Sequence, residues 1–147
     1  MIKDILKDEL VVTEANPLNW REAAKLAGNL LVDSGKVKQA FVDSMIATVE
    51  QYGPYMILVP KVCFFHGVPG PNVKEPCLSL VVFEKPVYFD DFDNQQINCC
   101  FAFGATDNES HMEMIKNVAF ILQDHTFIEM ITNNASKTEI MQVIKKY

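Results

Sequence analysis

Arginine is the scarcest charged residue in this chain, because Arg21 is the only arginine among 147 residues. The formal net charge is −6, and the lysines are scattered apart from the Lys145-Lys146 pair near the end. A nucleic-acid-binding domain normally shows a basic patch or stripe. The composition therefore argues against nucleic acid as a partner.

Long apolar runs are also missing. No stretch reaches the roughly 18 apolar residues that a membrane-spanning helix needs. The first ten residues, MIKDILKDEL, carry charges throughout and lack the apolar region of a secretion signal. We therefore expect a cytoplasmic protein, with residues 1–147 forming one domain large enough for a full hydrophobic core.

Cysteine pairs with C-x-x-C spacing are absent, which argues against zinc and thioredoxin-type sites. The four cysteines, Cys63, Cys77, Cys99 and Cys100, each lie in or beside an apolar run. A free thiol in such a run behaves as a small hydrophobic group. Without a secretion signal, disulfides are not expected. We expect all four thiols to be reduced and structural.

Metal-binding patterns are weak. Asp90, Asp91 and Asp93 lie in one loop, but this loop lacks the Gly and the terminal Glu of an EF-hand. We therefore expect a solvated turn there. A metal site built on His66 and His111 lacks a third ligand at convincing spacing. The sequence predicts neither a metal nor an organic cofactor.

The apolar patterns predict a mixed α/β fold. Asn19 is followed by Glu22, and Ser136 by Glu139, which is the spacing of a capping box at a helix start. Apolar residues at helical spacing follow both starts. The predicted helices span 2–8, 19–35, 38–52, 109–123, 127–131 and the segment from 136, and the predicted strands span 10–13, 55–59, 77–83 and 97–105.

Two histidines stand at the ends of different predicted elements. His66 lies between an apolar, strand-like stretch and a turn rich in Gly and Pro, and His111 opens a later helix. Histidine has an unperturbed pKa of about 6.5, so its ring is largely neutral and nucleophilic near pH 7. Each histidine alone, like His125 at a helix junction, is as typical of a surface residue. Their placement together predicts one shared site.

Several motifs in order strengthen this prediction. They are Gly53-Pro54-Tyr55, Pro60, His66-Gly67, Leu78-Ser79-Leu80-Val81, Phe83-Glu84-Lys85-Pro86-Val87, Ala105, Asp107, His111, Ile121-Leu122-Gln123-Asp124 and the tail ASKTEIMQVI. Over nearly the whole chain they resemble the IIA components of the bacterial phosphoenolpyruvate-dependent sugar phosphotransferase system, of the mannitol, fructose and ascorbate type. The resemblance is closest to the ascorbate type. His66 matches the phosphorylated histidine of this family, and His111 matches its second active-site histidine.

The resemblance implies a three-layer α/β/α sandwich with a mixed β-sheet. It also implies a phosphotransferase that accepts a phosphoryl group from the histidine phosphocarrier protein on His66. A cysteine of a IIB component would then take the group during sugar uptake, so the membrane is involved only through the permease. His111 would donate to the phosphoryl oxygens, helped by the N–H groups and the dipole at its helix start. Gly67 would leave room for the partner.

Three positions depart from the family pattern. Phe65 replaces the usual Pro before the active histidine, Lys61 replaces a Gly, and Val68 stands where ascorbate-type members often have arginine. Lys61 is a candidate for the missing positive charge, and a solvated surface lysine is the alternative. The departures also allow a IIA-like regulatory module that signals its phosphorylation state to a transcription factor. No DNA-binding region is attached and both histidines are present, which favours the phosphocarrier.

Overall fold

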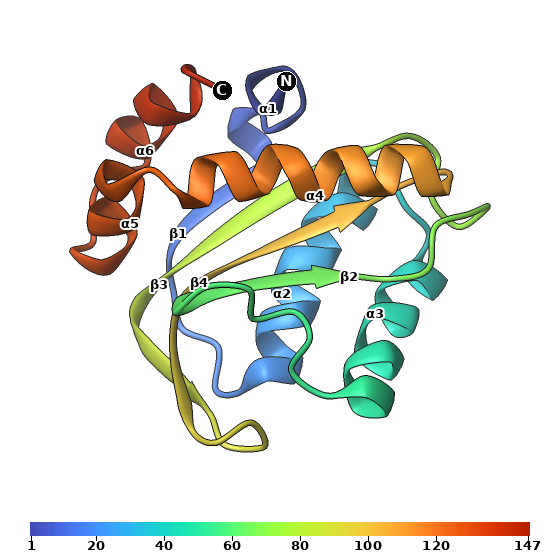
Figure 1. Cartoon of the computed structure of the whole chain (residues 1–147), viewed down its shortest axis with the longest axis horizontal. Helices are drawn as coiled ribbons and strands as arrows, with labels where there is room; N and C mark the ends of the chain where they lie inside the picture. Colours follow the sequence, from blue (N-terminus) through green and yellow to red (C-terminus); the bar gives the residue numbers. More distant parts are fainter.

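A four-stranded mixed sheet with the order β1-β3-β4-β2 forms the centre of the computed structural model, which describes all residues 1–147 (Figure 1). The strands are β1 (Val11–Ala15), β2 (Lys61–His66), β3 (Cys77–Phe89) and β4 (Gln95–Gly104). β3 and β4 are antiparallel, whereas β1 runs parallel to β3 and β2 parallel to β4. β2 is therefore an edge strand, and its end lies beside the end of β4.

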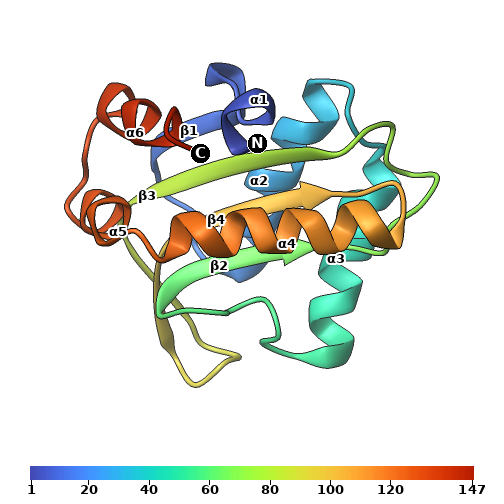
Figure 2. The ribbon, with the colours of Figure 1, turned by 45° about the horizontal axis from the view of Figure 1, so that its top comes forward.

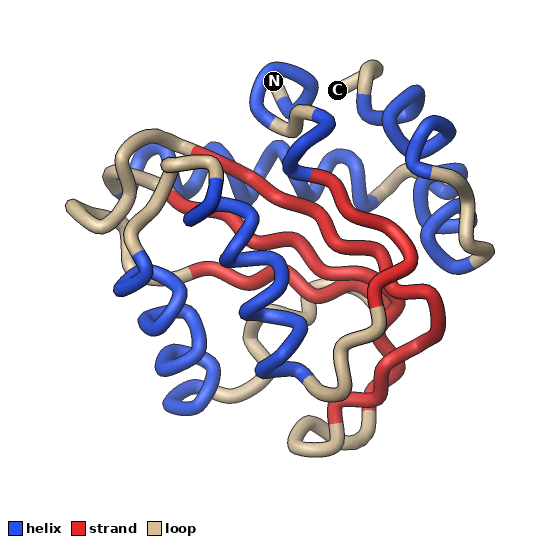
Figure 3. The backbone as a smooth tube through the Cα atoms, turned by 180° about the vertical axis from the view of Figure 1, so that it is seen from behind, coloured by secondary structure: helices blue, strands red, loops and turns tan.

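Helices cover both faces of this sheet. α2 (Trp20–Asp33) and α3 (Gln39–Tyr52) cover one face, as seen from behind in Figure 3, and α4 (Asn108–Leu122) crosses the other (Figure 2). α5 (His125–Thr132) follows α4 and contacts β4, and α6 (Lys137–Ile144) contacts β1. This is the three-layer α/β/α sandwich that the resemblance implies.

The chain begins with two short helical turns where one helix was predicted over 2–8. They are α1 (Ile2–Ile5) and a 3-10 turn (Asp8–Leu10), and Leu6 separates them with ψ of 75°, outside the helical range. No helix in the molecule is both long and apolar enough to cross a lipid bilayer.

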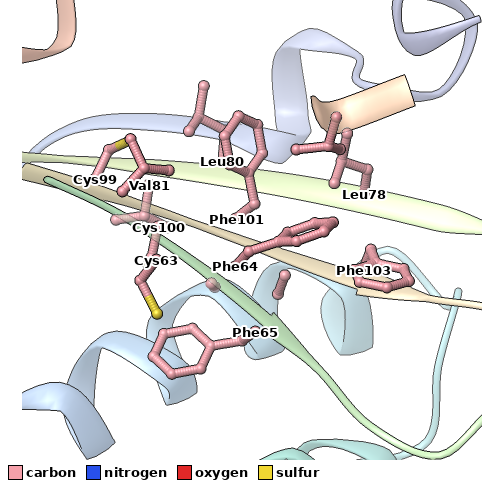
Figure 4. Packing of buried hydrophobic residues seen from close by; sticks show 14 of the residues in the cluster. Cys63, Phe64, Phe65, Leu78, Leu80, Val81, Cys99, Cys100, Phe101 and Phe103 are labelled. Atoms are coloured by element: carbon pink, nitrogen blue, oxygen red, sulfur yellow. The ribbon is translucent and has the colours of Figure 1, made fainter. Parts of the chain in front are cut away.

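One continuous core of 43 buried apolar residues fills both sides of the sheet. Successive side chains of β2 alternate between the faces: Phe65 points toward α2, whereas Phe64 points to the opposite face of the sheet (Figure 4). The Phe64 ring stacks on Phe103 with centroids 4.6 Å apart, and it meets Phe101 edge to face at 6.3 Å. This aromatic layer is the floor beneath the end of β2.

All four cysteines are free and buried, as predicted. Burial raises the pKa of the Cys77 thiol to about 12 and raises the pKa values of the other three as well. A protonated, water-excluded thiol is a poor nucleophile. The cysteines therefore serve packing in this fold.

The helix starts predicted at Asn19 and Ser136 are confirmed, but of the two only the Ser136–Glu139 pair forms a full capping box. The side chain of Asn19 accepts a hydrogen bond from the Glu22 amide at 3.0 Å. Ser136 and Glu139 cap each other reciprocally, with the Ser136 amide donating to the Glu139 carboxylate at 3.1 Å. Short polar side chains at these positions satisfy amides that have no partner inside the helix.

The predicted strand over 55–59 is wrong. The Tyr55 amide donates to the Gly53 carbonyl at 2.9 Å, so the chain turns at this point. The strand begins later, at the start of β2. The segment instead lies along the open edge of β2, where the Phe64 amide donates to the Met56 carbonyl at 2.7 Å. An apolar segment that covers a sheet edge has the composition of a strand but does not form the regular hydrogen bonds of one. The sequence pattern alone does not distinguish the two.

The β3–β4 hairpin is longer than predicted. β3 continues through Pro86 to Phe89, and its ladder with β4 is irregular between Val82 and Val87. Proline cannot donate to a ladder and is tolerated at such an irregularity. The expected solvated turn follows, and Asp91 in it accepts a hydrogen bond from the Trp20 indole at 3.0 Å.

Candidate functional site

His66 is the last residue of β2 and is in register with Phe103 on β4. Its Nδ1 lies 3.0 Å from the backbone carbonyl of Phe64. A carbonyl oxygen only accepts hydrogen bonds, so Nδ1 carries the hydrogen. In the neutral ring, Nε2 then holds the free lone pair.

The His66 ring is neutral at physiological pH. Burial against the aromatic floor lowers its pKa to about 4 from an ordinary 6.5, and the charge of His111 acts in the same direction. The hydrogen bond to the Phe64 carbonyl raises the pKa but does not offset burial. A neutral ring with one fixed tautomer presents a single nucleophilic nitrogen.

His111 lies in the first turn of α4 and faces His66. The two ring centroids are 5.2 Å apart with an interplanar angle of 69°. Phe103 lies beneath both, at 5.0 Å from His66 and 5.1 Å from His111. Partial burial lowers the pKa of His111. The structure thus brings together the two histidines that the sequence singles out.

The start of α4 differs from expectation. Asp107 caps the helix, with its carboxylate accepting from the Ser110 amide at 2.8 Å, and this hydrogen bond lowers the pKa of the carboxyl. The His111 amide donates to the Asp107 carbonyl at 3.1 Å. An anionic side chain therefore already occupies the positive end of this helix. Any anion beside His66 depends on the His111 ring more than on free helix-end amides.

Lys61 does not supply charge to this site. It is the first residue of β2 and His66 is the last, and five steps of about 3.3 Å place them ~16 Å apart. Lys61 is exposed and has a φ of 73°, in the left-handed region that favours glycine. That backbone conformation accounts for the glycine that the family usually has at this position.

Packing against α3 favours glycine at position 67. It is buried, and a Cβ built on it would lie 2.5 Å from Oγ of Ser44 and 3.1 Å from the Phe41 ring. Both residues belong to α3. The structure thus gives Gly67 a packing role, and the expectation that it leaves room for a partner stays a prediction. The glycine lets the chain after His66 lie directly against α3.

The only arginine cannot replace the family arginine. Arg21 forms salt bridges with Glu50 at 3.4 Å and Asp91 at 3.5 Å, and its guanidinium lies 4.5 Å above the Trp20 ring. Asp91 lies in the turn just before β4 begins, whereas His66 lies beside the end of β4. Arg21 thus stands at the opposite end of the sheet.

Tyr55 is a site residue that sequence reasoning missed. Its hydroxyl donates to the His66 backbone carbonyl at 2.9 Å. Its ring meets the imidazole edge to face, with centroids 4.8 Å apart and an angle of 90°. The Gly-Pro-Tyr motif is the only signal for it in the sequence, and a strand over 55–59 does not predict a contact between Tyr55 and His66.

The surroundings of the two histidines are open and partly apolar. Val68 is 68% exposed and Met112 is 63% exposed, and they lie next in the chain to Gly67 and His111. A hollow of about 650 Å³ on the outer face of α4 includes Met112 but neither imidazole. No group of three side chains of the metal-ligating types lies close enough to hold an ion. An exposed rim with apolar residues suits a protein partner.

Comparison with known proteins gives a family match over almost the whole chain. The family model described as phosphoenolpyruvate-dependent sugar phosphotransferase system, EIIA 2, matches residues 4–147. The ascorbate-specific PTS system EIIA component of Escherichia coli K12 is 26% identical over 143 residues, which cover 97% of this chain and 93% of that protein.

Solved structures share the fold. The solution structure of the mannitol-specific cryptic phosphotransferase enzyme IIA CmtB from Escherichia coli has a TM-score of 0.88, at 22% identity, over 99% of both chains. The IIA chain in a complex of enzyme IIA mannitol with phosphorylated enzyme IIB mannitol from Escherichia coli has a TM-score of 0.83, at 20% identity, over 97% of this chain and 98% of that one.

Proposed function

This chain belongs to the EIIA 2 family of the phosphoenolpyruvate-dependent sugar phosphotransferase system, and we propose that it is a phosphocarrier that acts through His66. As a family member it is a phosphotransfer component of that system. The observation that carries the proposal is the neutral imidazole whose Nδ1 is held by the Phe64 carbonyl at 3.0 Å. In this arrangement Nε2 is the nucleophile, and residues 1–147 act as one IIA-type domain.

The first transfer brings a phosphoryl group from a donor phosphohistidine. The lone pair of Nε2 of His66 attacks phosphorus, the donor's N–P bond breaks, and its electron pair returns to the donor ring. The proton on Nδ1 stays on the hydrogen bond to Phe64. Transfers of this loose kind need in-line positioning and stabilisation of charge more than covalent help. The rigid end of β2 provides the positioning.

His111 provides the charge stabilisation in this proposal. Its ring faces His66 at 5.2 Å between centroids, so an N–H of His111 reaches the oxygens of a group carried on Nε2. In the second transfer a thiolate of the acceptor attacks phosphorus, a sulfur–phosphorus bond forms, the Nε2–P bond breaks, and its electron pair returns to Nε2 of His66, which is neutral again. No arginine takes part, since Arg21 is engaged with Glu50 and Asp91.

The partners in this proposal are proteins. The donor is the histidine phosphocarrier protein, and the acceptor is a cysteine of a IIB component. The structure of a related IIA with phosphorylated IIB supports the second pairing. The exposed Val68 and Met112 offer apolar contacts beside the histidines. The reaction would take place in the cytoplasm, with the permease as the only link to the membrane.

Reconstitution of the first transfer tests the proposal. The chain is incubated with phosphoenolpyruvate, the general first enzyme of the system and the histidine phosphocarrier protein. We expect the intact mass to rise by one phosphoryl group that is labile in acid and stable in base. His66→Ala should take up none while keeping its fold.

His125→Ala is the matched control, because His125 is an exposed histidine in the first turn of α5. This variant should be labelled like the wild type. Full labelling of His66→Ala would reject His66 as the acceptor, and an unlabelled wild-type chain would reject the phosphocarrier function.

A further inference from the structure

The backbone at the end of β2 is held from outside the sheet. β2 is an edge strand, so one side of its backbone has no neighbouring strand. The segment before β2 lies along this side, where the Phe64 amide donates to Met56 at 2.7 Å. The Tyr55 hydroxyl extends the same arrangement by donating to the His66 carbonyl at 2.9 Å. The residue that carries the imidazole is thus anchored through its own backbone.

The imidazole is also held through its ring. Tyr55 meets it edge to face at 4.8 Å, and Phe103 lies against it at 5.0 Å. The hydrogen bond from Nδ1 to Phe64 fixes the rotation of the ring. Tyr55 lies outside the sheet and contacts both the backbone and the ring of His66.

We propose that Tyr55 is a positioning residue for phosphoryl transfer: its hydroxyl fixes the backbone of His66, and its ring holds the imidazole with Nε2 turned outward. This inference rests on the proposed function for its kinetic consequence, but the geometry of the imidazole can be tested separately. Tyr55 contacts neither the phosphoryl group nor the partner in this proposal. It acts through His66.

The hydroxyl is a permanent donor. Burial raises the pKa of Tyr55 to about 12, so the O–H remains intact at any physiological pH. The donated hydrogen bond and the ring contact are separable by mutation. Tyr55→Phe removes only the hydrogen bond, and Tyr55→Leu removes the aromatic edge as well.

We expect the two variants to lose different amounts of the phosphoryl-transfer rate. Displacing a reacting group by about 1 Å costs roughly 10²-fold in rate. We expect Tyr55→Leu to lose roughly that much, and Tyr55→Phe to lose about 3- to 10-fold because its ring still supports the imidazole. The loss should appear in the rate at saturating donor, with KM unchanged. A partner-binding role would instead raise KM.

Imidazole NMR gives the readout that does not need phosphoryl transfer. Nitrogen-15 shifts of His66 should show a pure Nδ1–H tautomer in the wild type and a tautomer mixture in Tyr55→Leu. The pKa of His66 should also rise from about 4 toward 6.5 in that variant, since water reaches the ring. The charge that acts on this titration comes from His111, which is unchanged in both variants.

Tyr88→Phe and Tyr88→Leu are matched controls, because Tyr88 is a half-exposed tyrosine on the far part of β3. They should behave as wild type in both assays. The proposal is overturned if the Tyr55 variants transfer within about twofold of wild type or lose rate only through KM, or if Tyr55→Leu keeps the wild-type tautomer and pKa of His66. If the wild type accepts no phosphoryl group, the function fails while the NMR measurements still decide the role of Tyr55.

Discussion

The two histidines differ in how their rings are held, and this difference assigns their roles. Nδ1 of His66 is fixed on the Phe64 carbonyl at 3.0 Å, which leaves Nε2 as a lone-pair nitrogen. No such hydrogen bond holds the ring of His111. A ring with a free N–H can turn to donate to an oxygen placed beside it. His66 suits the nucleophile, and His111 suits the donor.

His111→Ala should therefore impair transfer without abolishing acceptance. Loss of a single donor to developing charge costs about 10²–10³-fold in acyl-transfer sites. Water can replace part of the donor at this exposed site, so we expect about 10- to 100-fold slower passage to the IIB cysteine in rapid-quench measurements. His111→Gln keeps an N–H group and should recover part of the rate. An unchanged rate in His111→Ala would make the residue structural.

At the level of elements, the first residue of β2 has a backbone conformation that is unfavourable for a residue with a side chain. Lys61 has a φ of 73°, and the ladder with β4 shifts between Lys61 and Val62. The left-handed conformation costs an ordinary residue about 1–2 kcal/mol. Glycine avoids this cost but loses ~0.5–1 kcal/mol through its greater freedom in the unfolded chain.

Lys61→Gly should therefore stabilise the fold by up to ~1 kcal/mol, measured as a higher urea midpoint at an unchanged slope. Lys61→Ala is the control, because alanine keeps a Cβ and should give no such gain. Equal stabilisation by both substitutions would show that the lysine side chain, not the backbone, is the source. Phosphoryl acceptance should be unchanged in both, since the residue lies at the far end of β2 from His66.

The contact between Gly67 and α3 predicts an opposite effect. In Gly67→Ala the new methyl would lie 2.5 Å from Oγ of Ser44, so either this hydroxyl must leave its hydrogen bond to the Phe41 carbonyl or the chain after His66 must move. Overpacking of this kind typically costs 1–3 kcal/mol. The Ser44→Ala change removes the clashing oxygen, and the double variant should be destabilised by less than the sum of the single changes. Additive unfolding energies in this cycle would contradict the close contact.

The elements show which sequence signals were reliable. Asn19 and Ser136 marked helix starts because capping is chemistry within one turn of the chain. The strand predicted over 55–59 is wrong because an apolar run is equally typical of a strand in a ladder and of a segment that covers a sheet edge. The sequence also does not show that β2 begins at Lys61, and this extended strand places the lysine far from His66. Tyr55 was missed because its contact with His66 depends on that edge.

On the scale of the whole molecule, one end of the sheet holds the candidate site and the other end holds contacts between elements. The carboxyl ends of the parallel strands β2 and β4 meet at the edge that holds His66 and His111. Ligand sites in α/β folds commonly lie outside such ends. The opposite end holds the contacts of Arg21 with Glu50 and Asp91, which join α2, α3 and the hairpin. The only arginine thus ties elements together, away from the chemistry.

Burial of a neutral histidine also links the site to the stability of the whole fold. The pKa of His66 is about 4 in the folded chain, against 6.5 for a free histidine. Above pH ~6.5 the ring is neutral in both states and contributes no pH dependence. Between pH ~6.5 and ~4 the unfolded chain binds more protons, so the free energy of unfolding falls as pH falls. Below about 4 the effect levels off.

We therefore expect the free energy of unfolding of His66→Ala to rise relative to that of the wild type as the pH falls. The wild type should lose up to ~3 kcal/mol through His66 between pH 6.5 and 4, and the variant should lose none of this part. Protonation of carboxylates such as Asp107 and Asp124, whose pKa values are lowered in the fold, destabilises both proteins equally and cancels in the difference. Urea unfolding of both proteins at pH 7, 5.5 and 4.5 measures this difference in the free energy of unfolding. Parallel stability profiles would mean that the His66 ring is not buried in its neutral form.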